Sequence, residues 1–373
     1  MKLAIISHTA HYKRSDGTIV GWGPTINELN HLALKFEFIY HIAFLHKETP
    51  PPSAMPYEAN NIDLVPLKPV GGRSLQDKFA LVTSIPSVVN SVNKTLKQVD
   101  VFQLRTPTGI GVFLIPLLAI FYKKKGWYKY AGNWVQKKPP LGYAFQRWAL
   151  KKQSRKVTVN GQWEGDPPHI IPFENPCLTS GERQEGKQII KTKLYSAPFT
   201  FCFVGRLEDA KGVQRIIDVL TTLKHNSDIE AVHFIGNGPK MNHYKTQLKN
   251  VSIPTYFHGF LSRQEVFRIY KKSQFLLLPS TASEGFPKVI AEAMNYGCIP
   301  IVSTVSSIGQ YININNGFPL ENVTSAVLLK TFEKILKTNH DEFLQKANKG
   351  YIVSEHFTFD HYIHRIISEI LDT

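Results

Sequence analysis

Cysteine is scarce in this chain of 373 residues, because only Cys177, Cys202 and Cys298 occur and they stand far apart. Their spacing excludes both a disulfide framework and a zinc cluster. Long apolar runs are also lacking: the longest, residues 110–122, is shorter than the roughly 20 residues of a membrane-spanning helix and is interrupted by Pro116. The N-terminus has no basic leader followed by an apolar core. We therefore expect a reduced, cytoplasmic protein.

Acidic residues are few relative to basic ones, and the imbalance is uneven along the chain. The net charge of +15 divides into +11 for residues 1–190, with 24 Lys and Arg against 13 Asp and Glu, and +4 for residues 191–373, with 20 against 16. A stretch with no acidic residue holds eleven basic ones: Lys123, Lys124, Lys125, Lys129, Lys137, Lys138, Arg147, Lys151, Lys152, Arg155 and Lys156. A patch this one-sided is expected to attract an anionic surface.

The chain length favours two domains, and a composition of 43% hydrophobic and 20% charged residues is typical of globular proteins. Both halves alternate short β-rich runs with amphipathic stretches, which indicates parallel sheets covered by helices. The predicted strands are 2–7, 37–44, 101–104, 128–131 and 157–159 in the first half, and 199–205, 231–235, 255–258, 275–278 and 299–302 in the second. Ligands of such sheets bind outside the carboxyl ends of the strands.

The spacers between the later strands predict helices, at 211–224, 240–249, 263–272 and 287–296. The polar, glycine-containing stretch 179–192 lacks a strong hydrophobic period, and we interpret it as the linker between the domains.

Residues 283–294, which follow the predicted strand 275–278, form the most specific segment of the second half. Glu284 and Glu292 stand on either side of a junction from loop to helix. Pro287 suits the first position of that helix, where its missing N–H costs nothing. The free amides and the helix dipole there favour an anion, and an ionised carboxylate can accept both hydroxyl hydrogens of a ribose or sugar diol. Taken alone, each glutamate could equally be a solvated surface residue.

Two other strand ends carry residues suited to a diphosphate. Residues 203–212 run from a strand through a loop into a helix, and Arg206 and Lys211 place two cations there that could neutralise a departing diphosphate. Gly236 and Gly238 end another strand and permit close backbone approach, although a turn needs glycine with or without a ligand. The three motifs together favour binding over the plainer explanations.

The order Gly-Arg-x4-Lys-Gly, Gly-x-Gly-Pro, then Glu-Gly-Phe-Pro followed by Glu-Ala-Met resembles the retaining glycosyltransferases of family 4. The resemblance is strongest over residues 199–305. It implies an α/β chain with the GT-B fold, in which two Rossmann-like domains face each other across a cleft. The implied parts are an acceptor-binding domain at 1–180, a donor-binding domain at 193–355, and a C-terminal helix at 356–373 that packs back on the first domain.

The resemblance also implies roles for individual residues. Arg206 and Lys211 would hold the donor diphosphate, while Glu292 would bind the ribose. Glu284 would bind the hydroxyls of the transferred sugar, and backbone amides of the following loop would touch the sugar or phosphate. The implied catalytic residues are Glu284, Arg206, Lys211 and Asn133, and the implied donor-binding residues are Gly21, Gly23, Gly205, Gly236, Gly238, Gly285, Phe286, Pro287, Lys288, Val289 and Glu292.

In the first half the family pattern is irregular. Gly21 and Gly23 open the predicted helix 25–34 and resemble the family's N-terminal glycine loop beside the diphosphate. Many relatives have a histidine after a middle strand of this domain, where this chain has Asn133, and we expect Asn133 to contact the donor sugar. His11 follows the first strand, but an isolated histidine is more often a core or surface residue than a ligand.

The resemblance implies transfer of a hexosyl or N-acetylhexosaminyl group from a nucleoside-diphosphate sugar to an acceptor hydroxyl. It further implies retention of the anomeric configuration and a place in bacterial surface polysaccharide or glycolipid synthesis. The sequence has no Asp-x-Asp motif, so we expect neither a metal ion nor another cofactor. Two alternatives stay open: another GT-B enzyme such as a sugar-nucleotide epimerase, or a basic module that binds membranes or nucleic acid. The pair of glutamates disfavours the first, and we expect no nucleic-acid partner.

The apolar run 110–122 has two interpretations. It can be a crossover helix that buries one face between the strands 101–104 and 128–131. It can also form, together with the neighbouring lysines and aromatic residues, a surface that binds anionic lipid. Both can hold at once. We expect the basic patch to dock the protein on the inner face of the membrane, beside a lipid-linked sugar acceptor.

Overall fold

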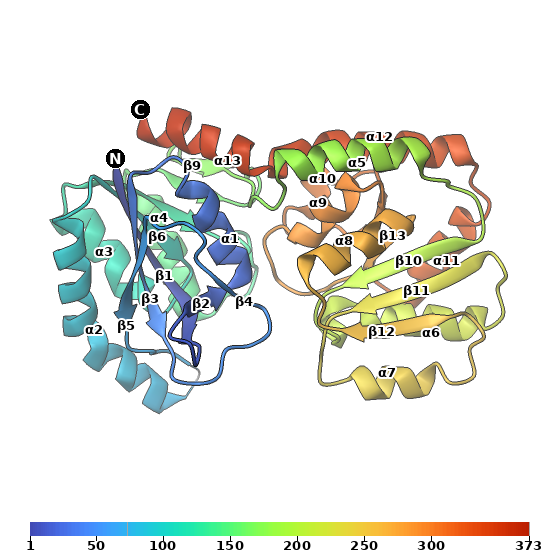
Figure 1. The fold of residues 1–373 in the computed structure, drawn as a ribbon, viewed down its shortest axis with the longest axis horizontal. Helices are drawn as coiled ribbons and strands as arrows, with labels where there is room; N and C mark the ends of the chain where they lie inside the picture. Colours follow the sequence, from blue (N-terminus) through green and yellow to red (C-terminus); the bar gives the residue numbers. More distant parts are fainter. Residues whose placement is uncertain (73, 373) are drawn as a thin grey trace. The chain divides into compact units, whose positions relative to one another are not determined.

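The computed structural model describes residues 1–72 and 74–372, and it divides into two compact α/β units (Figure 1). The first unit comprises Met1–Asn175 and the chain from Tyr362 onward. The second comprises Pro176–His361. The first unit thus ends at Asn175 instead of the expected residue 180, and only the last part of the C-terminal helix joins it.

The sheet of the second unit is parallel throughout, and each predicted strand of this half is present. In chain order the strands are β10 (Phe199–Val204), β11 (Ile229–Ile235), β12 (Thr255–Gly259), β13 (Phe275–Leu278), β14 (Ile299–Ser303) and β15 (Phe318–Leu320). Their spatial order is β12-β11-β10-β13-β14-β15, so the direction of winding reverses between β10 and β13. In doubly wound sheets the ligand crevice lies outside the carboxyl ends of the strands at this reversal.

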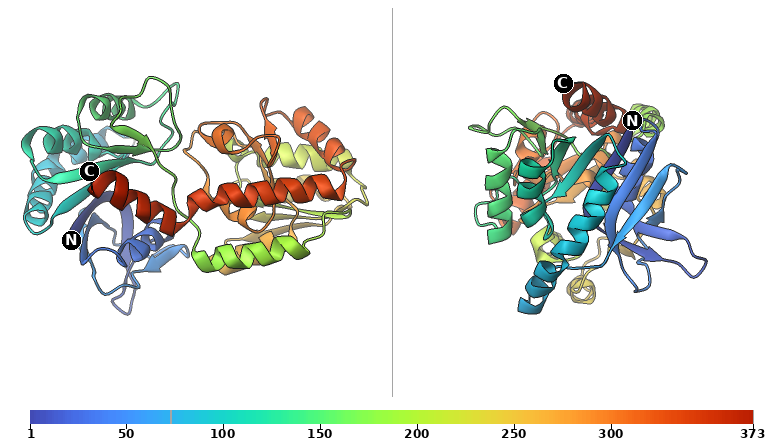
Figure 2. Two further views of the ribbon diagram at one scale, coloured as in Figure 1. Left: turned by 90° about the horizontal axis from the view of Figure 1, so that it is seen from above. Right: turned by 90° about the vertical axis from the view of Figure 1, so that its left-hand side faces the viewer.

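Helices and aromatic side chains build the rest of the second unit. Phe201 stacks between Phe275 and Phe332, with ring centroids 5.0 and 4.7 Å away, and all three rings are buried. The helical elements are α5 (Ser180–Thr192), η1 (Asp209–Lys211), α6 (Val213–Leu223), α7 (Met241–Gln247), α8 (Arg263–Lys272), α9 (Lys288–Asn295), α10 (Ile308–Tyr311), α11 (Ser325–Ile335), α12 (His340–Ser354) and η2 (Glu355–Phe357). Helices α5, α9 and α12 pack on one another, and α6 packs against α7 and α11. The green α5 and the red α12 lie on the same side of the unit in Figure 2.

The interpretation of residues 179–192 as a linker is wrong, because they form helix α5. Thr179 begins the helix with a capping box that it shares with Glu182. The buried face carries Arg183, Gly186 and Ile190, so it lacks the apolar stripe that marks most packed helices. A Cβ on Gly186 would lie 2.1 Å from the carbonyl oxygen of Asn295. This face of α5 is therefore buried by close approach of its backbone to the end of α9.

The first unit has a second Rossmann-like sheet. Its strands are β1 (Lys2–Lys13), β2 (Ile19–Trp22), β3 (Phe38–Leu45), β4 (Ala54–Pro56), β5 (Ile62–Leu67), β6 (Val101–Thr106), β7 (Lys125–Tyr130), β8 (Val157–Val159) and β9 (Ile170–Pro172). Strand β1 pairs in parallel with β3 and with β6. Beyond β3 the sheet continues in parallel to β5, and beyond β6 it continues in parallel through β7 and β8 to β9. Strand β2 pairs antiparallel with β1, and β4 pairs antiparallel with β2. The short strands β2, β4 and β9 escaped sequence prediction, and so did β5.

The helical elements of this unit are α1 (Gly23–Leu32), α2 (Leu75–Leu96), α3 (Gly111–Phe121), α4 (Leu141–Lys152), α13 (Phe359–Arg365) and η3 (Ile366–Leu371). Helix α3 links β6 to β7 and buries Leu114, Ile115 and Leu118, so its interpretation as a crossover helix is confirmed. From Tyr362 the chain packs its apolar side chains into the cluster that also holds Trp127 of β7. Within the described residues, no helix is both long and apolar enough to cross a membrane.

Candidate functional site

The loops after β10 and β13 meet at the reversal point of the second sheet. The carbonyl oxygen of Ala210, in η1, accepts hydrogen bonds from the backbone N–H groups of Thr281 (2.8 Å) and Ala282 (3.1 Å) and from the Ser280 hydroxyl (3.1 Å). Gly212 has a φ of +91°, and a Cβ there would lie 2.2 Å from the carbonyl oxygen of Pro279. Glycine at this position therefore lets the two loops that carry the predicted cations and the predicted sugar-binding glutamate lie together.

Lys211 and Glu284, 73 positions apart in sequence, form an ion pair at this point, with Lys211 Nζ donating to Glu284 Oε1. The Lys211 side chain is 15% exposed, whereas that of Glu284 is 40% exposed. The ammonium group is therefore mostly covered, and the carboxylate is the more exposed partner of the pair. The structure thus brings together two of the predicted catalytic residues.

Arg206 lies on the same loop but points into solvent. Its side chain is 70% exposed, and Nε lies 3.3 Å from Glu208 Oε2. Exposed ion pairs of this kind contribute little to stability, so the guanidinium group can turn to another anion at small cost. The position of Arg206 therefore fits two interpretations. The residue can be a surface charge beside Glu208, or it can be a ligand of the donor diphosphate.

Gly236 and Gly238 have a structural explanation that needs no ligand. A Cβ on Gly236 would lie 2.0 Å from the carbonyl oxygen of Gly205, and one on Gly238 would lie 2.2 Å from that of Leu207. The Leu207 N–H donates to the carbonyl oxygen of Asn237 at 3.0 Å. The loops after β10 and β11 thus lie backbone to backbone, and the two glycines hold the Arg206 loop in place.

Glu292, the predicted ribose ligand, is the fifth residue of α9 and only 12% of its side chain is exposed. Arg263 Nη1 donates to Glu292 Oε1 at 2.6 Å, while Nε and Nη2 donate to Glu182 at 3.2 and 3.0 Å. Burial lowers the pKa of Arg263, but the Glu292 and Glu182 carboxylates raise that pKa by more, so the guanidinium group stays protonated. Sequence reasoning missed Arg263, because at the start of a helix it resembles any surface arginine.

The Gly285–Pro287 segment is anchored by its aromatic side chain. Phe286 is 6% exposed and stacks on Phe357 with ring centroids 4.4 Å apart. Its backbone amide and that of Gly285 remain the predicted ligands. Pro287 precedes α9 and serves as its N-cap, so its predicted place at the first helical position is wrong by one residue, because its ψ of 117° is extended. Lys288 and Val289 open the helix, and both are partly buried.

A further polar cluster lies at the carboxyl end of β14. The hydroxyls of Ser303, Ser306 and Ser307 are buried, and none has a hydrogen-bond partner among the described residues. Ser306 adopts a φ of +56°, which is unusual outside glycine. Ser303 lines a small cavity together with Glu284 and other residues of the β13 loop. Buried hydroxyls without partners are rare, so they indicate a place for a polar ligand or water. The strand-end rule would have found this loop had it been applied to strand 299–302.

In the first unit the predicted glycine loop is not an open loop. Gly21 lies in β2 and pairs with His11 of β1, and a Cβ there would lie 2.6 Å from the His11 ring. Gly23 is the first residue of α1, where a Cβ would lie 2.8 Å from the carbonyl oxygen of Ser53. The antiparallel pairing of β2 with β1 therefore explains Gly21, and the close approach of the segment at β4 explains Gly23. Asn133, 9% exposed, accepts a hydrogen bond from the Val135 N–H at 3.1 Å and so shapes the turn after β7.

The basic patch is smaller than the sequence indicated, because six of its eleven residues contact other parts of the first unit. Lys129 is buried and pairs with Glu28. The other five donate to backbone carbonyls or a carboxylate: Lys124, Lys125, Arg147, Lys151 and Arg155. Six lysines of the stretch are exposed, and two of them, Lys125 and Lys151, make the contacts given above; Lys156 is half-buried. We name the other four the exposed lysine set: Lys123, Lys137, Lys138 and Lys152.

Comparisons with known proteins show which families and folds the chain resembles. Residues 184–351 match the family model of the glycosyl transferases group 1. An uncharacterized glycosyltransferase of Haemophilus influenzae is 29% identical over 204 residues, which cover 54% of each chain. The lipopolysaccharide 1,6-galactosyltransferase of Salmonella typhimurium is 31% identical over 110 residues, 29% of this chain and 30% of that one. The chain thus spans about half the length of the first relative and less than a third of the second.

Solved structures resemble the whole chain at low identity. HepE of Anabaena in complex with UDP has a TM-score of 0.71 and 14% identity, with all of both chains covered. Sucrose-phosphate synthase of Thermosynechococcus elongatus has a TM-score of 0.69 and 13% identity, covering 98% of this chain and 97% of that one. At such identities the likeness concerns the fold alone. The predicted α/β class is confirmed, because each of the two units is one Rossmann-like domain.

The matched segment lies within the second unit and contains the strand ends that carry Lys211, Glu284 and Glu292. The match to the glycosyl transferases group 1 model thus covers residues 184–351, which is most of the second unit, Pro176–His361.

Proposed function

We propose that this chain is a retaining glycosyltransferase that transfers a sugar from a nucleoside-diphosphate sugar to an acceptor hydroxyl. The observation that carries the proposal is the position of the Lys211–Glu284 pair and of Glu292 around the reversal point of the second sheet. Cations for a diphosphate and carboxylates for hydroxyls are the two kinds of group that such a donor requires.

In the proposed donor complex, Lys211 exchanges its contact with Glu284 for the diphosphate. The ammonium group then opposes the negative charge that develops on the leaving phosphate, and Arg206 adds a second cation from its exposed position. Glu284, released from Lys211, accepts hydrogen bonds from the hydroxyls of the transferred sugar. Because these cations neutralise the leaving group, the reaction needs no metal ion. Among the motifs no carboxylate is placed as a nucleophile, so the leaving phosphate accepts the proton of the acceptor hydroxyl on the same face of the sugar.

The names of similar proteins suggest which donor and acceptor to test first. HepE was crystallised with UDP, and the Salmonella relative is a lipopolysaccharide galactosyltransferase. We therefore propose a UDP-hexose as donor and a lipid-linked glycan of a surface polysaccharide or glycolipid as acceptor.

We also propose that the first unit docks on an anionic membrane surface through the exposed lysine set. Large apolar side chains accompany these lysines on the adjoining helices: Ile120 and Phe121 end α3 and are 72% and 74% exposed, and Leu141 begins α4 and is 90% exposed. Basic and apolar side chains together favour binding at a lipid interface. Docking would hold the enzyme beside a lipid-linked acceptor on the cytoplasmic side.

The proposed function is tested by donor hydrolysis. Purified protein is incubated with UDP-, GDP- and ADP-sugars, with and without EDTA, and nucleoside diphosphate release is measured. We expect slow hydrolysis of one donor class that EDTA does not change. Absence of hydrolysis and of nucleotide binding across the whole panel would contradict the enzyme, whereas activity that EDTA abolishes would contradict only the metal-free mechanism.

A further inference from the structure

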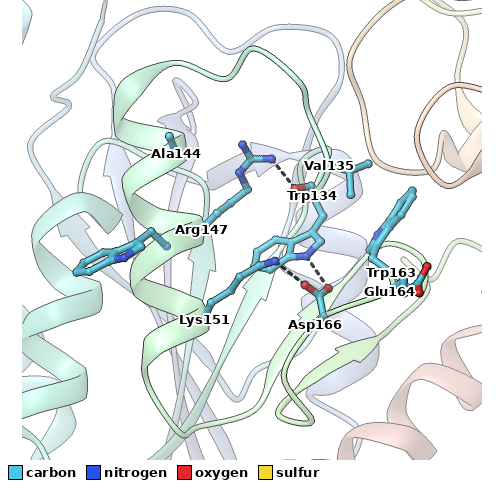
Figure 3. A pocket seen from close by; sticks show the side chains of 9 residues that line it. Trp134, Val135, Ala144, Arg147, Lys151, Trp163, Glu164 and Asp166 are labelled. Atoms are coloured by element: carbon cyan, nitrogen blue, oxygen red, sulfur yellow. Dashed lines mark hydrogen bonds and ion pairs between the residues drawn. The ribbon is translucent and has the colours of Figure 1, made fainter.

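A cavity of about 370 Å³ lies wholly within the first unit and is not used by the proposed donor chemistry (Figure 3). Its walls come from the turn after β7, from α4 and from the segment that precedes β9. Three of the five tryptophans of the chain line it: Trp134, Trp148 and Trp163. Its volume is that of roughly a dozen water molecules, at about 30 Å³ each, and lies within the usual range of ligand pockets.

The floor of the cavity is held together by hydrogen bonds and an ion pair. Trp134 is 2% exposed, and its Nε1 donates to Asp166 Oδ2 at 2.7 Å. Lys151 Nζ lies 2.7 Å from Asp166 Oδ1 and 5.5 Å from the centre of the Trp134 ring. Arg147 Nη1 donates to the Trp134 carbonyl oxygen at 2.5 Å, as the dashed lines in Figure 3 show. Because ring, carboxylate and cations hold one another, the site needs little reorganisation on binding.

The rim presents aromatic surface and a carboxylate to solvent. Trp148 is 59% exposed on α4. Trp163 is fixed by the hydrogen bond from its Nε1 to the Asn160 carbonyl oxygen at 2.9 Å. Glu164 is exposed and lines the same cavity. An exposed indole in a concave site usually serves binding, because it offers a flat apolar area at low cost in conformational entropy.

The charges in the cavity argue against a phosphate ligand. Arg147 is committed to the carbonyl oxygens of Trp134 and Gln136, at 2.5 and 3.2 Å, and Lys151 is committed to Asp166. The two cations are balanced by two carboxylates, so the cavity carries no net charge to attract an anion. A pyranose ring suits these walls: its C–H face can lie on an indole ring, and its hydroxyls can donate to the Glu164 carboxylate.

We propose that this cavity binds a neutral sugar ring of the acceptor glycan, with Trp148 and Trp163 as stacking surfaces and Glu164 as the hydroxyl acceptor. The inference rests on the proposed function, because a glycosyltransferase must recognise an acceptor in addition to its donor. It deepens that function by assigning one sugar ring of the proposed acceptor glycan to a defined cavity and to three named side chains of the first unit.

The test uses the full chain and saturation-transfer difference NMR with a panel of free hexoses, N-acetylhexosamines and their disaccharides. We expect at least one saccharide to bind the wild type and to bind about tenfold more weakly to Trp148→Ala and to Glu164→Gln. The matched control is Phe79→Ala, whose aromatic side chain is 71% exposed on α2, outside the cavity lining. Trp148 and Glu164 are exposed, so these variants are expected to fold, which circular dichroism checks.

The outcomes separate the two proposals. No binding of any saccharide, or equal binding to the wild type, Trp148→Ala and Glu164→Gln, overturns the cavity assignment. Binding of pyrophosphate that Trp148→Ala weakens would instead identify an anion site and also overturn it. Titration of the wild type with UDP, GDP and ADP tests the donor site separately. Nucleotide binding without saccharide binding would leave the proposed function standing, and absence of both nucleotide and saccharide binding would remove its basis.

Discussion

Replacing Glu292 tests the predicted ribose contact most directly. The glutamate is nearly buried on α9, and its Oε1 accepts a hydrogen bond from Arg263 at 2.6 Å, so the carboxylate is held in a fixed orientation with acceptor capacity left over. Hydrogen bonds to a charged acceptor are worth about 1.5–3 kcal/mol each. Two such bonds to a ribose diol amount to roughly 3–6 kcal/mol, and each 1.4 kcal/mol corresponds to a tenfold change in Kd. Glu292→Ala should therefore weaken nucleotide binding by about a hundredfold or more.

Glu292→Gln should weaken binding less, by about tenfold to a hundredfold, because the amide oxygen can keep the bond from Arg263 while the negative charge is lost. The fold should survive both changes, since Arg263 keeps Glu182 and the Cys177 carbonyl oxygen as partners. We expect the free energy of unfolding to fall by no more than about 1–3 kcal/mol in urea titrations.

The assay is isothermal titration calorimetry with UDP, and with GDP and ADP where UDP does not bind. Glu185→Ala is the matched control, because Glu185 also pairs with a cation of α8, Lys271, but is 46% exposed on α5, a helix that carries none of the predicted donor-site residues. Wild-type affinity in Glu292→Ala, or an equal loss in Glu185→Ala, would refute the assignment of Glu292 to the ribose.

Three further predictions follow from the same structure. Lys211→Ala should lower the turnover of donor hydrolysis by about 10²–10³-fold and affect the choice of sugar little, because the cation acts on charge that develops in the transition state. EDTA should leave wild-type turnover unchanged. An equal loss of donor affinity and turnover in Lys211→Ala would argue against stabilisation of the leaving group by Lys211. Changing the exposed lysine set to Gln should reduce sedimentation with anionic vesicles while donor hydrolysis is spared, and raising the salt concentration should have the same effect on the wild type; unchanged sedimentation would refute docking. Burial, as the largest cause, lowers the pKa of His11 to about 4 from 6.5, so the unfolded chain binds a proton there between these values and the folded chain does not. Stability should therefore fall by about 2 kcal/mol at this site as the pH drops from 6.5 to 5, and urea titrations of His11→Gln should show a correspondingly weaker pH dependence.

Much of the fold was readable from local pattern. The runs at 199–205, 231–235 and 275–278 are apolar, short and bounded by turn residues, and each became a parallel strand. Residue chemistry at their carboxyl ends was enough to predict that Lys211 and Glu284 belong to one site, because parallel strands deliver their loops to one edge of a sheet. The unusual helix α5 was not predictable in this way, since Gly186 and Arg183 replace the apolar stripe on its buried face.

The sequence by itself thus determined the α/β class, the strand ends and the types of residue at the donor motifs, because these depend on short-range periodicity and on chemistry carried by single residues. Tertiary structure alone decided that Arg263 holds Glu292, that Gly236 and Gly238 serve loop packing, and that most of the basic patch is tied down. It also decided that the three tryptophans meet in one cavity. The physical reason is that these features depend on distances between residues far apart in the chain, which packing sets and local pattern does not record.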